Sequence, residues 1–223
     1  VGSEMCIRDR ESADIDFDVA GSASDIVANA SDLSGASIVT VTDIADASQG
    51  VALDALEVSL VGDDSQADVL FNVADSASAI AFELSGDNTV LDNAESLVVT
   101  GGATDIVGAA NIQSSDAYDA AASSYTIADT AGAVLEATGT VIDDGVSTIN
   151  VAGSVNAGVG VQLGALEDAS FDTGFSADIN FNVIDDASDI ATALAGDDTV
   201  LDNAESLVVT SGIVSVDLSL IHI

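Results

Sequence analysis

The chain has 223 residues and carries 39 Asp and Glu residues against two Arg and no Lys, which gives a formal net charge of −37 at pH 7. Such a polyanion repels nucleic acid phosphates and anionic lipid, so nucleic acid is excluded as a partner. Yet 48% of the residues are hydrophobic and the mean hydropathy is +0.44, which excludes a disordered acidic tail and predicts a buried core.

The two ends of the chain differ from the rest in composition. They hold both arginines, the one cysteine, the one methionine and the one histidine. The peptides "EMCIRDR" (4–10) and "LSLIHI" (218–223) can be encoded by DNA sequences that are reverse complements of each other. The pair resembles a sequencing-library adapter translated in both orientations, so residues 1–10 and 218–223 are expected to be adapter-derived artefacts around a metagenomic fragment. A natural N-terminus and a natural hydrophobic tail are the alternative.

A repeat of about 54 residues runs through the segment 11–217. The string "TVLDNAESLVVT" occurs twice, at 89–100 and at 199–210, with an offset of 110 residues. A second motif, an aromatic residue followed two positions later by an aliphatic one, starts at Phe17, Phe71, Tyr125 and Phe181, with spacings of 54, 54 and 56 residues. These spacings predict four repeats, the last of them truncated, with the following bounds: 11–66, 67–121, 122–176 and 177–217.

Each repeat is predicted to contain a strand, a helix, a second strand and a second helix. The first strand is expected to lead into an aspartate that caps an Ala-rich helix, as at Asp75, Asp129 and Asp185. Gly86 and Gly196 are expected to end two of these helices in the left-handed conformation. The remaining elements are predicted at the following segments: strands at 37–42, 96–100, 147–152 and 206–210, and helices at 48–56 and 156–166.

This unit predicts an α/β fold. A strand, a helix and a parallel strand are joined by a right-handed crossover, and one such unit buries its strands only against its neighbours. We therefore predict an α/β repeat solenoid of about four strand–helix–strand–helix units with short parallel strands, in which equivalent strands of successive repeats pair and the repeated aromatic residues are buried. Whether the two strand families form one sheet or two stays open, because helices are about 10 Å wide and strands about 4.8 Å apart. An all-β parallel β-helix is the alternative.

Acidic clusters at the expected loops make calcium the candidate cofactor. Ca²⁺ takes about six to eight oxygen ligands from carboxylates, amides and carbonyl groups. Two clusters occupy equivalent positions of different repeats, so a site in one predicts a site in the other. The candidate ligands are Asp87, Asp92 and Glu95 in one loop, and Asp197, Asp198, Asp202 and Glu205 in the other. Neither matches an EF-hand loop, and the alternative is that these side chains cap turns or are solvated.

Catalysis is not expected. Between residues 11 and 217 the chain has no His, Cys, Lys or Arg, so it offers no imidazole base, thiolate or amine. Two carboxylates suffice for glycoside hydrolysis, but nothing distinguishes one pair among so many, and the chain has no Trp to serve as a sugar platform. A carboxylate-based hydrolase is the remaining enzymatic alternative. No run of about 18 apolar residues is present, so membrane insertion of this segment is not expected.

The segments "YTIADTAGAV" (125–134) and "VTVTDIADASQGVALDAL" (39–56) resemble the tandem repeats of large secreted acidic bacterial adhesins and hemolysin-type calcium-binding exoproteins. The resemblance implies an extracellular or cell-surface location and a structural role as a spacer or stalk of an adhesin-like or surface-layer-like protein. The implied partners are neighbouring repeats of the same larger chain. The glycine-rich calcium-binding nonapeptide of such proteins is absent. A calcium-dependent module that binds an extracellular glycan or protein surface is the alternative function.

Overall fold

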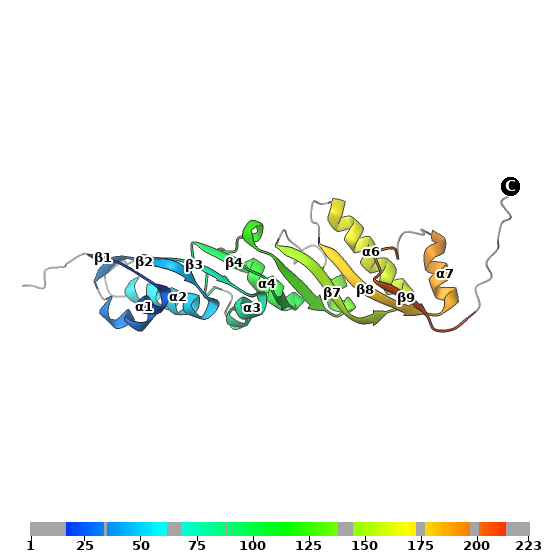
Figure 1. Cartoon of the computed structure of the whole chain (residues 1–223), viewed down its shortest axis with the longest axis horizontal. Coiled ribbons are helices and arrows are strands. Elements are labelled where there is room, and N and C mark those ends of the chain that lie inside the picture. Colours follow the sequence, from blue (N-terminus) through cyan, green and yellow to red (C-terminus); the bar gives the residue numbers. More distant parts are fainter. Residues whose placement is uncertain are drawn as a thin grey trace, which may run out of the picture.

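The computed structural model describes residues 17–33, 35–61, 68–87, 89–137, 145–172, 177–196 and 201–212. Within these residues the chain is α/β, with seven α-helices and two all-parallel sheets that follow one another along the long axis (Figure 1). The helices rule out the all-β alternative. The two expected adapter segments, 1–10 and 218–223, lie outside the described residues.

The first sheet has the strand order β1-β2-β3-β4. Its strands are β1 (Phe17–Gly21), β2 (Ala36–Ala45), β3 (Asp68–Asp75) and β4 (Ser96–Val99). They alternate with α1 (Ala23–Ala28), the 3₁₀ turn η1 (Ala30–Asp32), α2 (Ala47–Val61) and α3 (Ala77–Leu84).

The second sheet has the strand order β5-β6-β7-β8-β9. Its strands are β5 (Ala103–Thr104), β6 (Tyr125–Asp129), β7 (Val146–Val155), β8 (Asp178–Asp185) and β9 (Ser206–Val209). They alternate with α4 (Ile106–Ser114), the 3₁₀ turn η2 (Ala120–Ala122), α5 (Ala131–Glu136), α6 (Ala157–Asp172) and α7 (Ala187–Gly196). The elements thus follow the order strand, helix, strand, helix that the sequence pattern predicts, except that β5 follows β4 directly.

Each strand pairs in parallel with the strand that follows it in sequence, so the prediction that equivalent strands pair is wrong. The aromatic strands β1, β3, β6 and β8 alternate with the aliphatic strands β2, β4, β7 and β9. A helical crossover returns the chain beside the strand it has just left, which places unlike strands next to each other. Both strand families therefore contribute to each sheet.

The two sheets are joined at a glycine pair. Gly101 and Gly102 have φ angles of 136° and 81°, which bend the chain between β4 and β5. The following segment 117–124 then runs along the free edge of β4, with Leu97 N donating to Ala117 O at 2.8 Å and Ser124 N donating to Val99 O at 2.8 Å. Backbone hydrogen bonds therefore continue across the break between the sheets.

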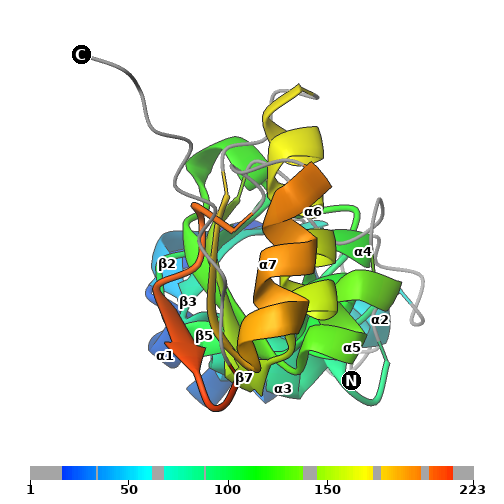
Figure 2. The same cartoon turned by 90° about the vertical axis from the view of Figure 1, so that its right-hand side faces the viewer.

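The core lies between the sheets and the helices on one side of them. Along β3 the side chains alternate, with Val69, Phe71 and Val73 buried and their neighbours turned outward. In the view along the long axis, α4, α5, α6 and α7 lie on one side of the strands (Figure 2). The other face of β3 carries exposed residues, as the alternation requires.

The repeated aromatic residues are buried, with one exception. Phe71, Tyr125 and Phe181 are at most 1% exposed, which confirms the prediction for three of the four. Phe17 is 38% exposed, so the prediction is wrong there. The reason is that β1 is an edge strand, and no described unit packs on its outer side.

The helices that follow the aromatic strands β3, β6 and β8 begin one residue later than predicted, whereas α2, predicted at 48–56, begins one residue earlier, at Ala47. Ser76 and Thr130 are the N-caps of α3 and α5, since their side chains accept from Ala79 N and Ala133 N, and Asp186 likewise accepts from Asp189 N at the start of α7. The aspartates expected to be caps, Asp75, Asp129 and Asp185, are instead the last residues of their strands. A serine, threonine or second aspartate directly after each one takes the capping position.

The strand-end aspartates link neighbouring units. Asp75 Oδ2 accepts a hydrogen bond at 3.1 Å from Ala47 N, the first residue of the preceding helix α2. The same bond joins Asp43 to Ala23 N at 2.7 Å, Asp129 to Ile106 N at 3.1 Å and Asp185 to Ala157 N at 2.9 Å. Each bond satisfies one of the backbone N–H groups that a helix leaves open at its start.

The predicted glycine C-caps are also wrong. Helix α3 ends at Leu84 with Ser85 as a right-handed C-cap, and Gly86 is not among the glycines with positive φ. Gly196 is the last residue of α7.

Candidate functional site

The structure places the predicted calcium ligands of the first loop apart from one another. Asp87 Oδ1 accepts from Thr89 Oγ1 at 2.7 Å and from Thr89 N at 3.1 Å, and these bonds lower the pKa of the Asp87 carboxyl. Asp92 points toward the end of α4, where its Oδ1 accepts from Ser115 Oγ at 2.9 Å and from Asp116 N at 3.0 Å. Glu95 is exposed. In the described part of the chain, these residues do not bring three carboxylate oxygens close enough together to bind one metal ion.

The second loop is described only in part. Asp197 and Asp198 lie outside the described residues. Asp202 and Glu205 are both exposed, and Glu205 Oε2 accepts from Asn182 Nδ2 at 3.5 Å. Calcium binding by either loop therefore stays a prediction.

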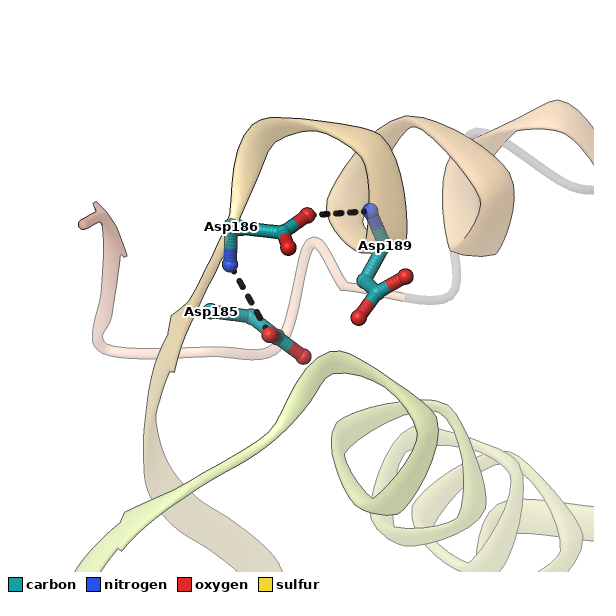
Figure 3. A group of neighbouring side chains, drawn as sticks. All are labelled: Asp185, Asp186 and Asp189. Carbon is teal, nitrogen blue, oxygen red and sulfur yellow. Dashed lines mark hydrogen bonds between the residues drawn. The ribbon is translucent and has the colours of Figure 1, made fainter. Parts of the chain in front are cut away.

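Three other aspartates form the one acidic group of metal-binding size in the described part of the chain. Asp185, Asp186 and Asp189, at the start of α7, each offer a carboxylate oxygen within 4.8 Å of the others (Figure 3). All three belong to the string "DDASD" (185–189), in which the sequence pattern predicts a role for Asp185 alone, as a helix cap.

Hydrogen bonds already occupy most of this group. Asp185 accepts from Asp186 N at 2.8 Å and from Ala157 N at 2.9 Å. Asp186 Oδ1 accepts from Asp189 N at 3.0 Å and from the hydroxyl of Ser188 at 2.8 Å, and these bonds lower the pKa of the Asp186 carboxyl. Asp189 alone remains exposed without such a role (Figure 3). Asp185 and Asp186 thus cap the starts of α6 and α7. Their carboxylate oxygens are also ligands of the kind that a hard cation such as Ca²⁺ binds.

A second set of acidic side chains is buried inside the array, which the sequence analysis missed. Asp54 of α2 is 9% exposed, and burial raises the pKa of its carboxyl even though Asn93 donates to it through its backbone N–H and side-chain amide. The other oxygen of Asp54, Oδ1, is buried and has no hydrogen-bond partner. The sequence pattern that could indicate this burial is an aspartate between two leucines that are themselves buried, as in "LDAL" (53–56).

The repeat-equivalent glutamates Glu57 and Glu167 lie in the same layer of the structure. Burial raises the pKa of both, and each accepts from the backbone N–H at the start of the next strand, from Val69 and Ile179 respectively. Glu167 is 7% exposed and also accepts from the amide of Asn203, the repeat equivalent of Asn93. The raised pKa values follow from packing of the helices on the strands.

Open grooves lie between the first turns of neighbouring helices. One of about 500 Å³ lies between α6 and α7 and is lined by Asn156, Asp185, Asp189 and Thr192, among others. A groove of the same volume, about 500 Å³, lies at the equivalent position between α2 and α3. The repeat thus generates the same surface depression more than once, with different side chains lining it.

Comparison of the chain with protein-family models, with curated proteins and with solved structures finds no match. Among the described helices, none is both long and apolar enough to cross a membrane.

Proposed function

We propose that the chain is a segment of an α/β solenoid that serves as a structural spacer or stalk in a secreted or cell-surface bacterial protein of the adhesin or surface-layer type. In this role it lies outside the cell, contacts neighbouring repeats of a larger chain and catalyses no reaction. The proposal is supported by how identical sequences are packed at two places in the array.

The carrying observation is a comparison of β4 with β9, which have the same sequence, "SLVV". In β4, Leu97 and Val99 are 0% exposed, and the segment 117–124 that follows runs along this strand. In β9, the equivalent Leu207 and Val209 are 44% and 52% exposed. The same apolar strand is therefore covered in one copy and exposed in the other. An exposed apolar strand of this kind is the surface on which a further repeat would pack.

The hydrogen bonds between units support the same proposal. The first N–H of a helix is accepted by the end of the next strand, through Asp75 for α2 and Asp185 for α6. Where no aspartate is present, a carbonyl takes its place, as Gly101 O does for Ala77 N and Ser211 O for Ala187 N. The end of each of these strands therefore completes the start of the preceding helix, between repeats through Asp75 and Asp185 and within a repeat through the carbonyl groups. A contact that recurs in this way is expected of a repeat array.

The charge of the chain suits a spacer. A net charge of −37 keeps separate arrays apart and in solution through mutual repulsion. The same repulsion acts within one array, so the fold is expected to gain stability as salt screens it.

The test is to append a second copy of residues 103–212 directly after Gly212, which continues the repeat in register. We expect the backbone amides of Leu207 and Val209 to change from rapid to slow hydrogen–deuterium exchange, since their equivalents Leu97 and Val99 donate to segment 117–124, and we expect the two parts to unfold in one transition. Fast exchange at these two amides in the extended chain, together with two separate transitions, would overturn the proposal. An extended chain carrying Leu207→Asp is the control, since a charge at that edge should prevent stacking.

A calcium-dependent module that binds a glycan or a protein surface is the second candidate function, and the grouping of Asp185, Asp186 and Asp189 favours it. Thermal unfolding would be followed in EDTA and then with calcium, with magnesium and with NaCl at matched ionic strength. Saturable stabilisation by micromolar calcium alone, lost in Asp189→Ala, would support the module. Equal stabilisation by NaCl would leave the spacer as the function.

A further inference from the structure

The third helix carries an aromatic residue that the repeat does not explain. Phe82 of α3 is 74% exposed, more than any other large hydrophobic residue in the described part of the chain. The equivalent residues, six positions after each N-cap, are Ala28, Glu136 and Thr192. An architectural role would not require a solvent-exposed phenyl ring at only one of four equivalent places. Phe82 also shares a groove with the exposed Val107, so the two side chains form a small apolar surface.

Phe82 stands between two surface grooves. The first, between α2 and α3, has a volume of about 500 Å³ and is lined by Asp46, Asp75, Phe82 and Glu83 along with small residues. The second, between α3 and α4, has a volume of about 290 Å³ and is also lined by Phe82 and by Val107, which is 66% exposed. The phenyl ring therefore forms a wall of both grooves.

The first groove is negatively charged. Asp46 and Asp75 accept hydrogen bonds from helix N-termini, whose dipoles offset part of their charge. Glu83, next to Phe82, is half-buried, and no described residue donates a hydrogen bond to its carboxylate. Because residues 11–217 contain no Lys, Arg or His, this segment cannot supply a cation to the groove itself.

We propose that Phe82 and Glu83 form a docking site for an arginine side chain of a basic partner polypeptide. A guanidinium group is planar and weakly hydrated, so it stacks on a phenyl ring and pairs with a carboxylate at the same time. The ammonium of lysine is a compact, strongly hydrated charge and gains less from the ring. The overall negative charge of the chain steers such a partner toward the groove. This site does not depend on the spacer function.

The experiment compares two fluorescein-labelled peptides of equal charge, hexa-arginine and hexa-lysine, titrated into the chain and into Phe82→Thr. Threonine is the residue that the repeat itself places at the equivalent position 192, so the variant keeps both the fold and the net charge. We expect the chain to bind hexa-arginine about two- to fivefold more tightly than hexa-lysine, the range of a surface cation–π contact. The preference should disappear in Phe82→Thr and fall in Glu83→Gln.

A gain-of-function variant and a local probe complete the test. The double variant Thr192→Phe with Ala193→Glu transfers the pair to the groove between α6 and α7, and we expect it to raise the number of arginine-preferring sites from one to two. In the chain labelled with 4-fluorophenylalanine, the ¹⁹F resonance that is missing in Phe82→Thr should shift on addition of hexa-arginine.

Equal affinity for the two peptides, or a preference for arginine that survives in Phe82→Thr, would overturn the proposal and leave only general attraction between opposite charges. A shift of the Phe82 resonance by a neutral oligosaccharide or an uncharged apolar peptide, and not by hexa-arginine, would overturn it in favour of a different occupant.

Discussion

Leu97→Ala and Leu207→Ala make the same change in two copies of one twelve-residue string, yet they should differ in their effect on stability. Leu97 is 0% exposed beneath the following unit, whereas Leu207 is 44% exposed at the end of the described array. Removing three buried carbon atoms costs about 0.8 kcal/mol each, and the cavity left at a closed site adds to that. We expect a loss of about 3–4 kcal/mol for Leu97→Ala and of about 1 kcal/mol for Leu207→Ala.

The difference would be measured by urea unfolding followed by circular dichroism. The free energies of unfolding would be compared with one value of m, the slope of the free energy against urea concentration. Val98→Ala and Val208→Ala provide the matched control, because both valines are partly exposed and both changes should cost little. Equal losses for the two leucine variants would refute the reasoning, since they would mean that the end strand is covered as fully as the internal one.

Three further predictions concern the packing of units and their buried acids. Gly50→Ala should destabilise the fold by about 1–3 kcal/mol, because a methyl group there would lie 2.7 Å from a valine side chain of β3 and 2.9 Å from a leucine side chain. Gly132→Ala is the control: a methyl group there would have no atom within 4 Å, so the change should be neutral or stabilising. Thermal unfolding would compare the two variants. Asp75→Ala should cost about 1–2 kcal/mol in urea unfolding, because the first N–H of α2 loses its acceptor, and no loss would contradict the linking role of the strand-end aspartates. Burial raises the pKa of Asp54, so the folded state binds its proton more tightly than the unfolded state, and its charge costs stability as the pH rises above the ordinary range of aspartate. The free energy of unfolding should therefore fall between pH 4 and pH 7 less steeply in Asp54→Asn than in the wild type, and an equal slope in the two proteins would contradict the role of burial at Asp54.

The elements could be predicted from the sequence because their patterns repeat. An aromatic residue with an aliphatic residue two positions on, as at Phe71 and Val73, marks a strand with one buried face, and both side chains are at most 1% exposed. The repeat gives this pattern several independent occurrences. The caps were placed one residue early, because Asp75 and Ser76 are both favourable capping residues and only the backbone decides between them.

Strand pairing and the surface sites could not be predicted in the same way. Equivalence in sequence predicts that like strands pair, but β2 lies between β1 and β3 and pairs with both. Each helical crossover packs back on the sheet and places the next strand beside the strand it follows, whether or not the two strands are alike. Asp54 and Asn93 meet only through the packing of α2 against the turn before β4, and nothing in either local sequence indicates the other. Phe82 lies outside the repeated aromatic positions, and nothing in its local sequence indicates that its side chain is 74% exposed.

The length of an extended array tests the central proposal most directly. Small-angle X-ray scattering would compare the chain with the chain to which residues 103–212 are appended. If units stack end to end, the largest dimension should grow by about 20 Å where strand spacing sets the rise and by up to about 40 Å where helix packing sets it, with no change in cross-section. Growth in cross-section, or the scattering of two bodies joined flexibly, would contradict the account of the chain as a stacking spacer.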